Sequence, residues 1–123
     1  MDEQVVFRAG EGPYHQIRPD LEGVLIGGEK VTLVRWEFPV GRPATPVHSH
    51  RDHEQFCIML SGTVRTVLGD ETVTLSAGDV MRIQRNVPHG ATVVVGNEPA
   101  VMLDVYSPPR EEYVAAAAKP AKR

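Results

Sequence analysis

Short apolar runs alternate with turn-forming residues along most of the chain. Eleven glycines and ten prolines separate these runs, and this punctuation favours strands over helices. The pattern predicts eight strands, at residues 23–27, 30–38, 55–60, 63–68, 71–75, 79–83, 91–95 and 100–106. Short strands spaced about ten residues apart indicate an all-β sandwich or barrel.

Alternation within the strand at 55–60 separates its side chains into two faces. Gln55, Cys57 and Met59 share one face, and Glu54 falls on the other. We expect Cys57 and Met59 to line the interior, with Cys57 as a buried structural thiol rather than a nucleophile. Trp36, in the middle of another strand, is expected in the core or at a dimer contact.

The late strand at 100–106 carries an acidic residue in an apolar setting. Met102, Asp104 and Tyr106 share one face of this strand. An aspartate between Leu103 and Val105 departs from the apolar pattern unless its face lines a cavity. The alternative is a charge at the end of a strand or on the surface.

One helix is favoured, over the C-terminal sequence REEYVAAAA at 110–118. Helices this short are marginal in water unless they dock. The 123 residues suffice for one domain and are too few for two. We therefore expect one β-barrel domain over residues 1–113 and a flexible C-terminal tail over 114–123.

Charge and composition narrow the function classes. Of 13 basic residues, three lie in the last five positions, whereas the 16 acidic residues all lie before them. An acidic body argues against nucleic-acid binding, so an anionic ligand needs a local arginine. No apolar run is long enough to span a membrane. An acidic N-terminus without a signal sequence and a lone cysteine favour the cytoplasm.

Three of the five histidines lie in the segment PVHSHRDHEQF, at 46–56. On a strand, His48 and His50 point to the same side, which lets two imidazoles reach one ion. His53 follows a predicted turn, so its direction stays open, and His15 has no identifiable partner. Paired histidines of this spacing are also common on surfaces that bind no metal.

An oxygen and a third imidazole complete a candidate metal site. Only one of Glu54 and Gln55 can face the side of the paired histidines. His89 follows Pro88, which fixes the backbone just before the imidazole. Three nitrogens and one oxygen, with room for water or substrate, suit zinc, iron, nickel, cobalt or manganese.

The two histidine blocks resemble the paired motifs of the cupin family. The first motif, G-x5-H-x-H-x3/4-E-x6-G, is matched by Gly41, His48, His50, the segment RDHEQ and Gly62, with one extra residue after Gly41. The second, G-x5-P-x-G-x2-H-x3-N, is matched at Gly78 and His89, and departs from the family pattern at Gln84, Asn86 and Val93. Asparagine tolerates a left-handed backbone, so the turn at Asn86 survives.

The resemblance implies a small, single-domain jelly-roll barrel with one divalent transition metal. Six residues, 56–61, separate Gln55 from Gly62, so Gln55 takes the acidic ligand position of the family. The implied ligands are therefore His48, His50, Gln55 and His89. A neutral glutamine leaves the full charge of the metal to stabilise an anionic oxygen.

The segment LDVYSPPREEY, at 103–113, resembles the cupins of the pectin-degradation group. These have a His/His/Gln/His metal site and convert 4,5-unsaturated monouronates to linear keto-uronates. Their catalytic aspartate, aromatic residue and arginine carry over to Asp104, Tyr106 and Arg110, with tyrosine where phenylalanine is usual. The resemblance implies that Asp104 moves a proton, Arg110 binds the substrate carboxylate and Tyr106 packs against the sugar ring.

The leading hypothesis is thus a metal-dependent isomerase or tautomerase acting on a small acidic carbohydrate, and a homodimer by resemblance. Two alternatives remain at this point. One is an iron-dependent dioxygenase, because the same ligands suit iron and O₂. The other is a cupin that binds a metabolite without turning it over, since one fold hosts many functions.

Overall fold

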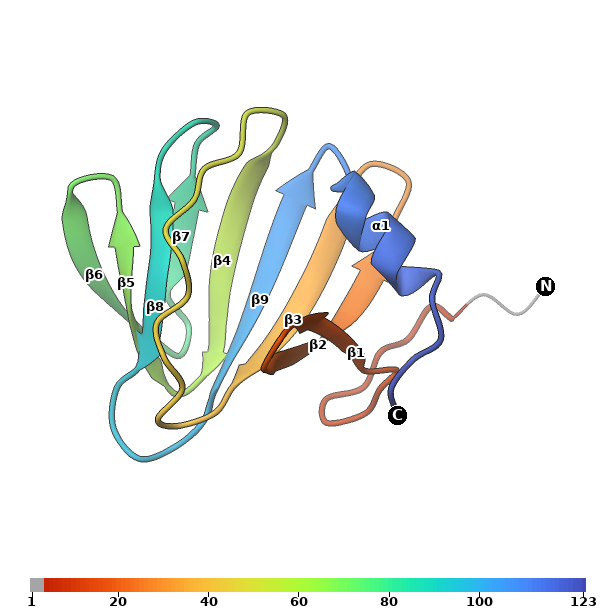
Figure 1. Ribbon diagram of the computed structural model, residues 1–123, viewed down its shortest axis with the longest axis horizontal. Coiled ribbons are helices and arrows are strands. Elements are labelled where there is room, and N and C mark those ends of the chain that lie inside the picture. The colour runs from red at the N-terminus through yellow and green to blue at the C-terminus, as the bar shows by residue number, and fades with distance from the viewer. Residues whose placement is uncertain (1–3) are drawn as a thin grey trace.

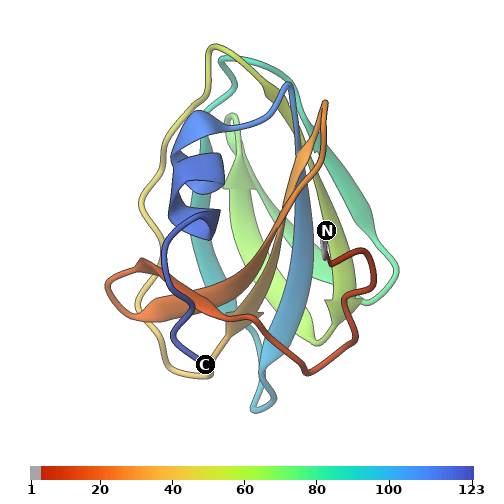
Figure 2. The same ribbon diagram turned by 90° about the vertical axis from the view of Figure 1, so that its right-hand side faces the viewer.

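The strands of the chain form two antiparallel sheets. The computed structural model describes residues 4–123. Its strands are β1 (His15–Arg18), β2 (Leu21–Gly27), β3 (Thr32–Phe38), β4 (Glu54–Ser61), β5 (Thr63–Leu68), β6 (Glu71–Ser76), β7 (Val80–Ile83), β8 (His89–Val94) and β9 (Ala100–Ser107). One sheet has the order β1-β2-β3-β9-β4-β7 and the other β6-β5-β8. The sheets face each other across a common interior, as in a jelly roll (Figures 1 and 2).

Strand β9 lies at the centre of the large sheet and pairs with β3 and β4. Its register places Asp104 beside Val34 on one side and Cys57 on the other. Tyr106 pairs with Gln55 in the same way. Met102, Asp104 and Tyr106 share one face, as the alternation predicts, and all three are buried, so this face of β9 lines the interior.

The eight predicted strands are confirmed, with shifts of one or two residues at most ends. The structure adds β1, whose four residues HQIR lack the apolar alternation that marks a strand. It also extends β8 back to His89, which we had placed in the preceding turn. The His48–His50 segment lies in the connection between β3 and β4. There His48 makes an isolated bridge to His89 rather than belonging to a strand.

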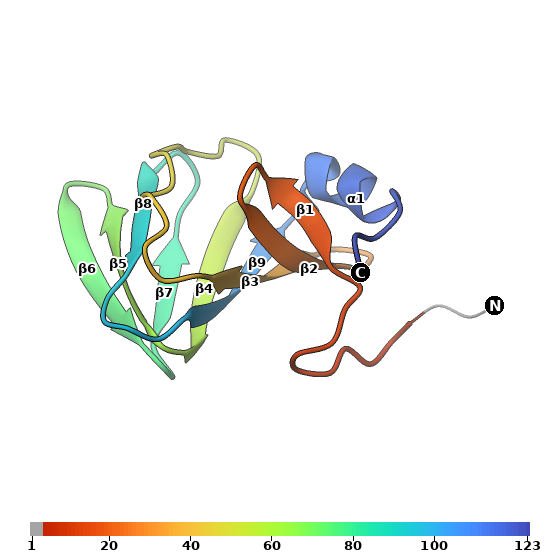
Figure 3. The same cartoon turned by 60° about the horizontal axis from the view of Figure 1, so that its bottom comes forward.

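The predicted helix is present as α1 (Glu111–Ala117). It lies beside β1 and β2 at the edge of the large sheet (Figures 1 and 3). Its Tyr113 is buried, with its ring centroid 5.5 Å from that of Tyr106 and 6.2 Å from that of Trp36. Beyond the helix, the Lys122 backbone N–H donates to the Tyr14 carbonyl at 2.7 Å. The helix and the end of the chain thus contact the barrel, and the division into a domain over 1–113 and a flexible tail over 114–123 stays a prediction.

Along residues 4–123, no helix is long and apolar enough to cross a membrane.

Gly90 allows two segments near the histidines to approach closely. Its φ is +128°, and a Cβ at this position would overlap the Pro46 carbonyl oxygen. The same backbone neighbourhood includes Val47 Cα, 3.1 Å from that Cβ position. Only glycine therefore fits, because backbone atoms cannot swing aside as a long side chain can.

Replacing Gly90 by alanine is expected to lower the free energy of unfolding by about 3–5 kcal/mol, because backbone strain and a steric clash add. Gly78→Ala is the matched control. Gly78 has a φ of +94°, but nothing lies within 4 Å of a Cβ there, so a loss of only about 1–2 kcal/mol is expected. Denaturant unfolding of both variants measures the difference, and equal losses would contradict the role assigned to the Pro46 contact.

Candidate metal centre

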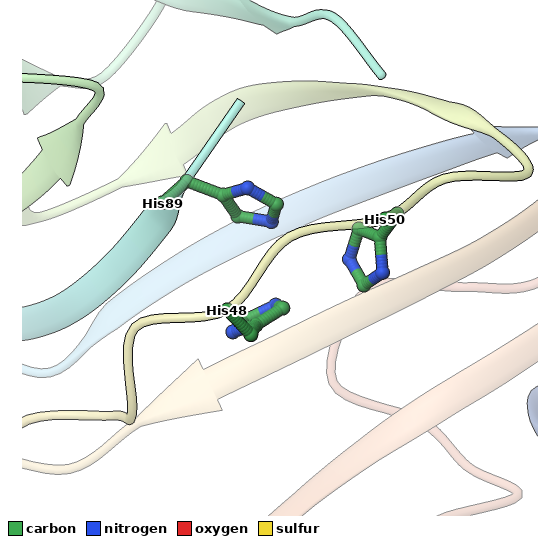
Figure 4. A group of neighbouring side chains, drawn as sticks. All are labelled: His48, His50 and His89. Carbon is green, nitrogen blue, oxygen red and sulfur yellow. The ribbon is translucent and has the colours of Figure 1, made fainter. Parts of the chain in front are cut away.

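Three imidazoles converge from two separate segments of the chain. His48 and His50 come from the β3–β4 connection and His89 from the start of β8, and their rings gather around a common space (Figure 4). Their candidate ligand atoms all lie within 4.8 Å of one another. Two backbone hydrogen bonds of 2.8 Å, from His48 N to His89 O and from His89 N to His48 O, hold the segments together.

Backbone carbonyls orient two of these rings. Nδ1 of His48 lies 3.0 Å from the Pro46 carbonyl oxygen, and Nδ1 of His89 lies 2.9 Å from that of Val87. A carbonyl only accepts, so Nδ1 carries the proton and Nε2 keeps a free lone pair. Nε2 of His89 and Nε2 of His50 are buried without a hydrogen-bond partner among the described residues. Free, inward-facing imidazole nitrogens are what a metal ion requires.

Gln55 and Glu54 lie on opposite faces of β4. Gln55 is 4% exposed and faces the interior, where its Nε2 donates to Cys57 Sγ at 3.4 Å. Its Oε1 is buried and has no hydrogen-bond partner within residues 4–123. Glu54 lies on the other face of β4, 3.9 Å from Arg82 Nε. Three imidazole nitrogens and a free amide oxygen therefore fit a transition-metal ion, and Glu54 points elsewhere.

Asp104 lies deeper in the same interior. Trp36 Nε1–H donates to its Oδ2 at 2.8 Å, and the Tyr106 hydroxyl donates to the same oxygen at 3.4 Å. Its Oδ1 is buried without a partner in the described part of the chain. Burial raises the pKa of Asp104, and the hydrogen bonds from Cys57 and Trp36 oppose this rise. A carboxyl group with one free oxygen and a raised pKa is suited to proton transfer.

Arg110 is buried beside Tyr106, just before α1. Its Nη1 donates to the Tyr113 hydroxyl at 3.0 Å, and its Nε forms an ion pair with Glu112. Its Cζ lies 4.2 Å from the Tyr113 ring centroid and 5.3 Å from that of Tyr106. The guanidinium is therefore held by several contacts before any ligand is considered.

One cavity joins most of these groups. It is lined by Arg18, Leu21, Trp36, Phe38, Thr45, His48, Gln55, Cys57, Thr66, Met81, Ile83, His89, Gly90, Thr92, Met102, Asp104 and Tyr106. Its volume is about 50 Å³, which leaves room for more than one water molecule. His48, on its lining, is half-buried.

A family model described as the cupin domain matches residues 34–106, more than half of the chain. The chain is a cupin.

Relatives of this cupin are found in sequence and in structure. It is 28% identical to the pectin degradation protein KdgF of Dickeya dadantii over 109 residues. The aligned region covers 88% of this cupin and 96% of the relative. The predicted resemblance to the pectin-degradation group is confirmed by this similarity. An RmlC-like cupin from Shewanella frigidimarina superimposes with a TM-score of 0.76 at 24% identity, over 91% of this chain and 96% of that one. KdgF from Halomonas sp. superimposes with a TM-score of 0.71 at 23% identity, over 80% of this chain and 90% of that one. The two structural matches support the predicted cupin fold.

Sequence reasoning missed two residues near this cupin's candidate site. The His53 ring centroid lies 4.6 Å from that of His50 and 5.5 Å from that of Tyr106, so His53, whose direction the sequence left open, lies beside the site. Arg18 lines the cavity from the unpredicted strand β1. His15, by contrast, lies away from the cavity, with Nε2 3.0 Å from the Lys119 carbonyl oxygen. The sequence did not place His53 because a turn precedes it, and did not place Arg18 because β1 has no apolar alternation.

The other sequence-based assignments near the cavity agree with the structure. Cys57 and Met59 are buried in the core, and burial raises the pKa of the Cys57 thiol, which makes it unreactive. Trp36 is a core residue at 3% exposure. Asn86 has a φ of +69°, the left-handed backbone that we expected asparagine to tolerate.

Metal binding to this cupin is expected to depend little on pH between 6 and 8. Burial, followed by the charge of Arg110, lowers the pKa of His50 to about 3, and burial also lowers the pKa of His48 and of His89. His50 therefore stays neutral at pH 6, and burial shifts the pKa values of His48 and His89 in the same direction. Each ordinary imidazole, with a pKa of 6.5, would instead reduce affinity at pH 6 about fourfold.

Calorimetric zinc titration in buffers of different ionisation enthalpy measures this directly. We expect little proton release at pH 6. A loss of affinity of about 70-fold between pH 8 and pH 6, as three ordinary imidazoles would give, would contradict the prediction. The pKa values of the three histidines are lower in the folded than in the unfolded chain, so below about pH 6.5 the unfolded chain binds more protons than the folded one. The free energy of unfolding should therefore decrease as the pH falls below about 6.5.

Proposed function

We propose that this cupin is a metal-dependent enzyme that opens the ring of 4,5-unsaturated monouronates to linear keto-uronates. One observation supports this most strongly. The free Oδ1 of buried Asp104 shares a cavity with the free oxygen of Gln55 and with His48 and His89. Similarity to a pectin degradation protein supports the substrate class.

In the proposal, His48, His50, Gln55 and His89 hold one divalent transition-metal ion. The ion supplies a Lewis acid that stabilises negative charge on a substrate oxygen. Gln55 is neutral, so it does not reduce that charge as a glutamate would. The tautomerisation moves a proton from oxygen to carbon without gain or loss of atoms, so it needs no redox partner.

Asp104 moves this proton. Trp36 and Tyr106 hold its Oδ2, which leaves Oδ1 to face the ligand. Arg110, fixed by Tyr113 and Glu112, binds the substrate carboxylate. Tyr106 packs its ring against the sugar.

Turnover of an unsaturated monouronate, followed by loss of the absorbance of its conjugated double bond, tests the proposal. We expect a rate well above that of the spontaneous reaction, lost on chelation, restored by a divalent transition metal and equal with and without O₂. O₂ consumption during turnover would favour the dioxygenase instead. Tight binding of the uronate without turnover would favour a metabolite-binding protein.

A homodimer and a cytoplasmic location stay predictions of the sequence and the family resemblance. Size-exclusion chromatography with light scattering tests the first, and we expect twice the mass of one chain. Fractionation of the source cells tests the second.

A further inference from the structure

Strand β1 brings a second arginine to the cavity. Arg18 pairs with Leu21 of β2 after an irregularity in the register of β1. Paired residues of neighbouring strands share a face of the sheet, and Leu21 is 1% exposed in the core. Arg18 accordingly points inward, lines the same cavity as His48, His89 and Asp104, and places its Cζ 5.8 Å from the centroid of the Trp36 ring.

The guanidinium of Arg18 has no hydrogen bond or ion pair with any side chain or carbonyl in residues 4–123. Its sequence neighbour Asp20 pairs instead with Arg42 at 2.7 Å. Asp104 directs Oδ2 to Trp36 and Tyr106. Arg18 is half-buried and its guanidinium nitrogens reach solvent, so they are free to donate to water or to a ligand.

Arg110 differs from Arg18 in its charge balance. Glu112 forms an ion pair with Arg110, so this pair carries little net charge. Arg18 has no such partner among residues 4–123, so no ion pair balances its charge. Within the described chain, Arg18 thus supplies uncompensated positive charge at a site that belongs to an acidic protein.

We propose that Arg18 binds the carboxylate of the acidic ligand, as a second arm beside Arg110, and so determines the preference of this cupin for acidic sugars. A guanidinium forms paired hydrogen bonds with a carboxylate, and both partners gain most where water is partly excluded. Arg18 lies outside residues 34–106, which the cupin domain model matches. The proposal rests on the acidic ligand of the proposed function but not on its reaction.

The fluorescence of Trp36, the only tryptophan of the chain, reports on ligands in this cavity. The test titrates metal-loaded protein with sodium glucuronate and with glucuronamide, which has the same ring but no charge. Arg18→Gln is expected to weaken glucuronate binding about 10- to 100-fold and to leave glucuronamide binding unchanged. Arg18→Lys keeps the charge but cannot form the paired hydrogen bonds of a guanidinium. Its affinity for glucuronate should lie between that of the wild type and that of Arg18→Gln.

Arg65→Gln is the matched control, because it removes the same charge from an exposed position on β5. It should bind glucuronate as the wild type does. Equal glucuronate affinity in wild type and Arg18→Gln would overturn the proposal, and so would a wild-type protein that does not prefer glucuronate to glucuronamide.

Turnover separates this inference from the proposed function. With an unsaturated monouronate, Arg18→Gln is expected to raise KM about tenfold or more and to change kcat little. Arg18-dependent glucuronate binding without any turnover would support the inference and contradict the proposed reaction. Turnover with the same KM in wild type and Arg18→Gln would contradict the inference alone.

Discussion

Replacing Asp104 by asparagine is expected to lower kcat for ring opening of a 4,5-unsaturated monouronate by about 10²- to 10⁴-fold, the usual contribution of a proton-transferring group. Asparagine keeps an oxygen that accepts the hydrogen bond from Trp36, but it cannot exchange a proton with the substrate. The geometry of the interior should survive, and with it the content of bound metal. Steady-state kinetics beside elemental analysis measures both quantities.

Stability should not explain this loss. Burial raises the pKa of Asp104 in the folded state, so its contribution to stability is present below its unfolded pKa and decreases as the pH rises through the folded value. Asparagine does not ionise, so the variant should be at least as stable as the wild type at neutral pH. Thermal unfolding at several pH values checks this sign.

Asp70→Asn is the matched control for the chemical change, because Asp70 is exposed in a turn between β5 and β6. Its kcat should equal that of the wild type. A near-normal kcat in Asp104→Asn would remove Asp104 from proton transfer. Loss of metal together with kcat would instead assign it a role in supporting the metal site.

Replacing His50 or His89 by alanine is expected to reduce bound metal from about one ion per chain to less than about one tenth, after removal of loosely bound ions. Each variant removes one of the three imidazoles whose ligand atoms lie within 4.8 Å of one another. A remaining pair of nitrogens and one amide oxygen hold a divalent ion far more weakly. Elemental analysis of protein purified without a histidine tag measures the change.

His15→Ala provides the comparison, because it removes an imidazole that is held by the Lys119 carbonyl and lies away from the cavity. It should keep the metal, whatever its effect on stability. Full metal content in both His50→Ala and His89→Ala would contradict the site. Loss of metal from His15→Ala as well would point to unfolding rather than to lost ligands.

Local patterns in the sequence were enough to predict the strands and part of the site. Alternation alone places Asp104 and Tyr106 on the same face of β9, and Gln55 on the opposite face from Glu54. These predictions succeed because strand geometry fixes side-chain direction from one residue to the next. Bringing His89 to His48 needed the family motifs, since nothing in the local sequence specifies a contact between such distant residues.

Other features depend on tertiary contacts that no local pattern encodes. β1 is a strand because it pairs with β2, and its own four residues carry no strand signal. Arg18 is therefore invisible to sequence reasoning as a cavity residue. The partners of Arg110 are also set by the docking of α1, which places Tyr113 and Glu112 beside the guanidinium.

The paired backbone hydrogen bonds between His48 and His89 make the ligand set preorganised. They join the two ligand-bearing segments through main-chain atoms alone, so the arrangement does not require an ion to hold it. Metal uptake then has little ordering entropy to overcome, in contrast to small zinc domains whose folding and metal binding are one event. The chelated protein should consequently keep its sheet structure and reload quickly, so that loss and recovery of activity can be followed in the same folded molecule.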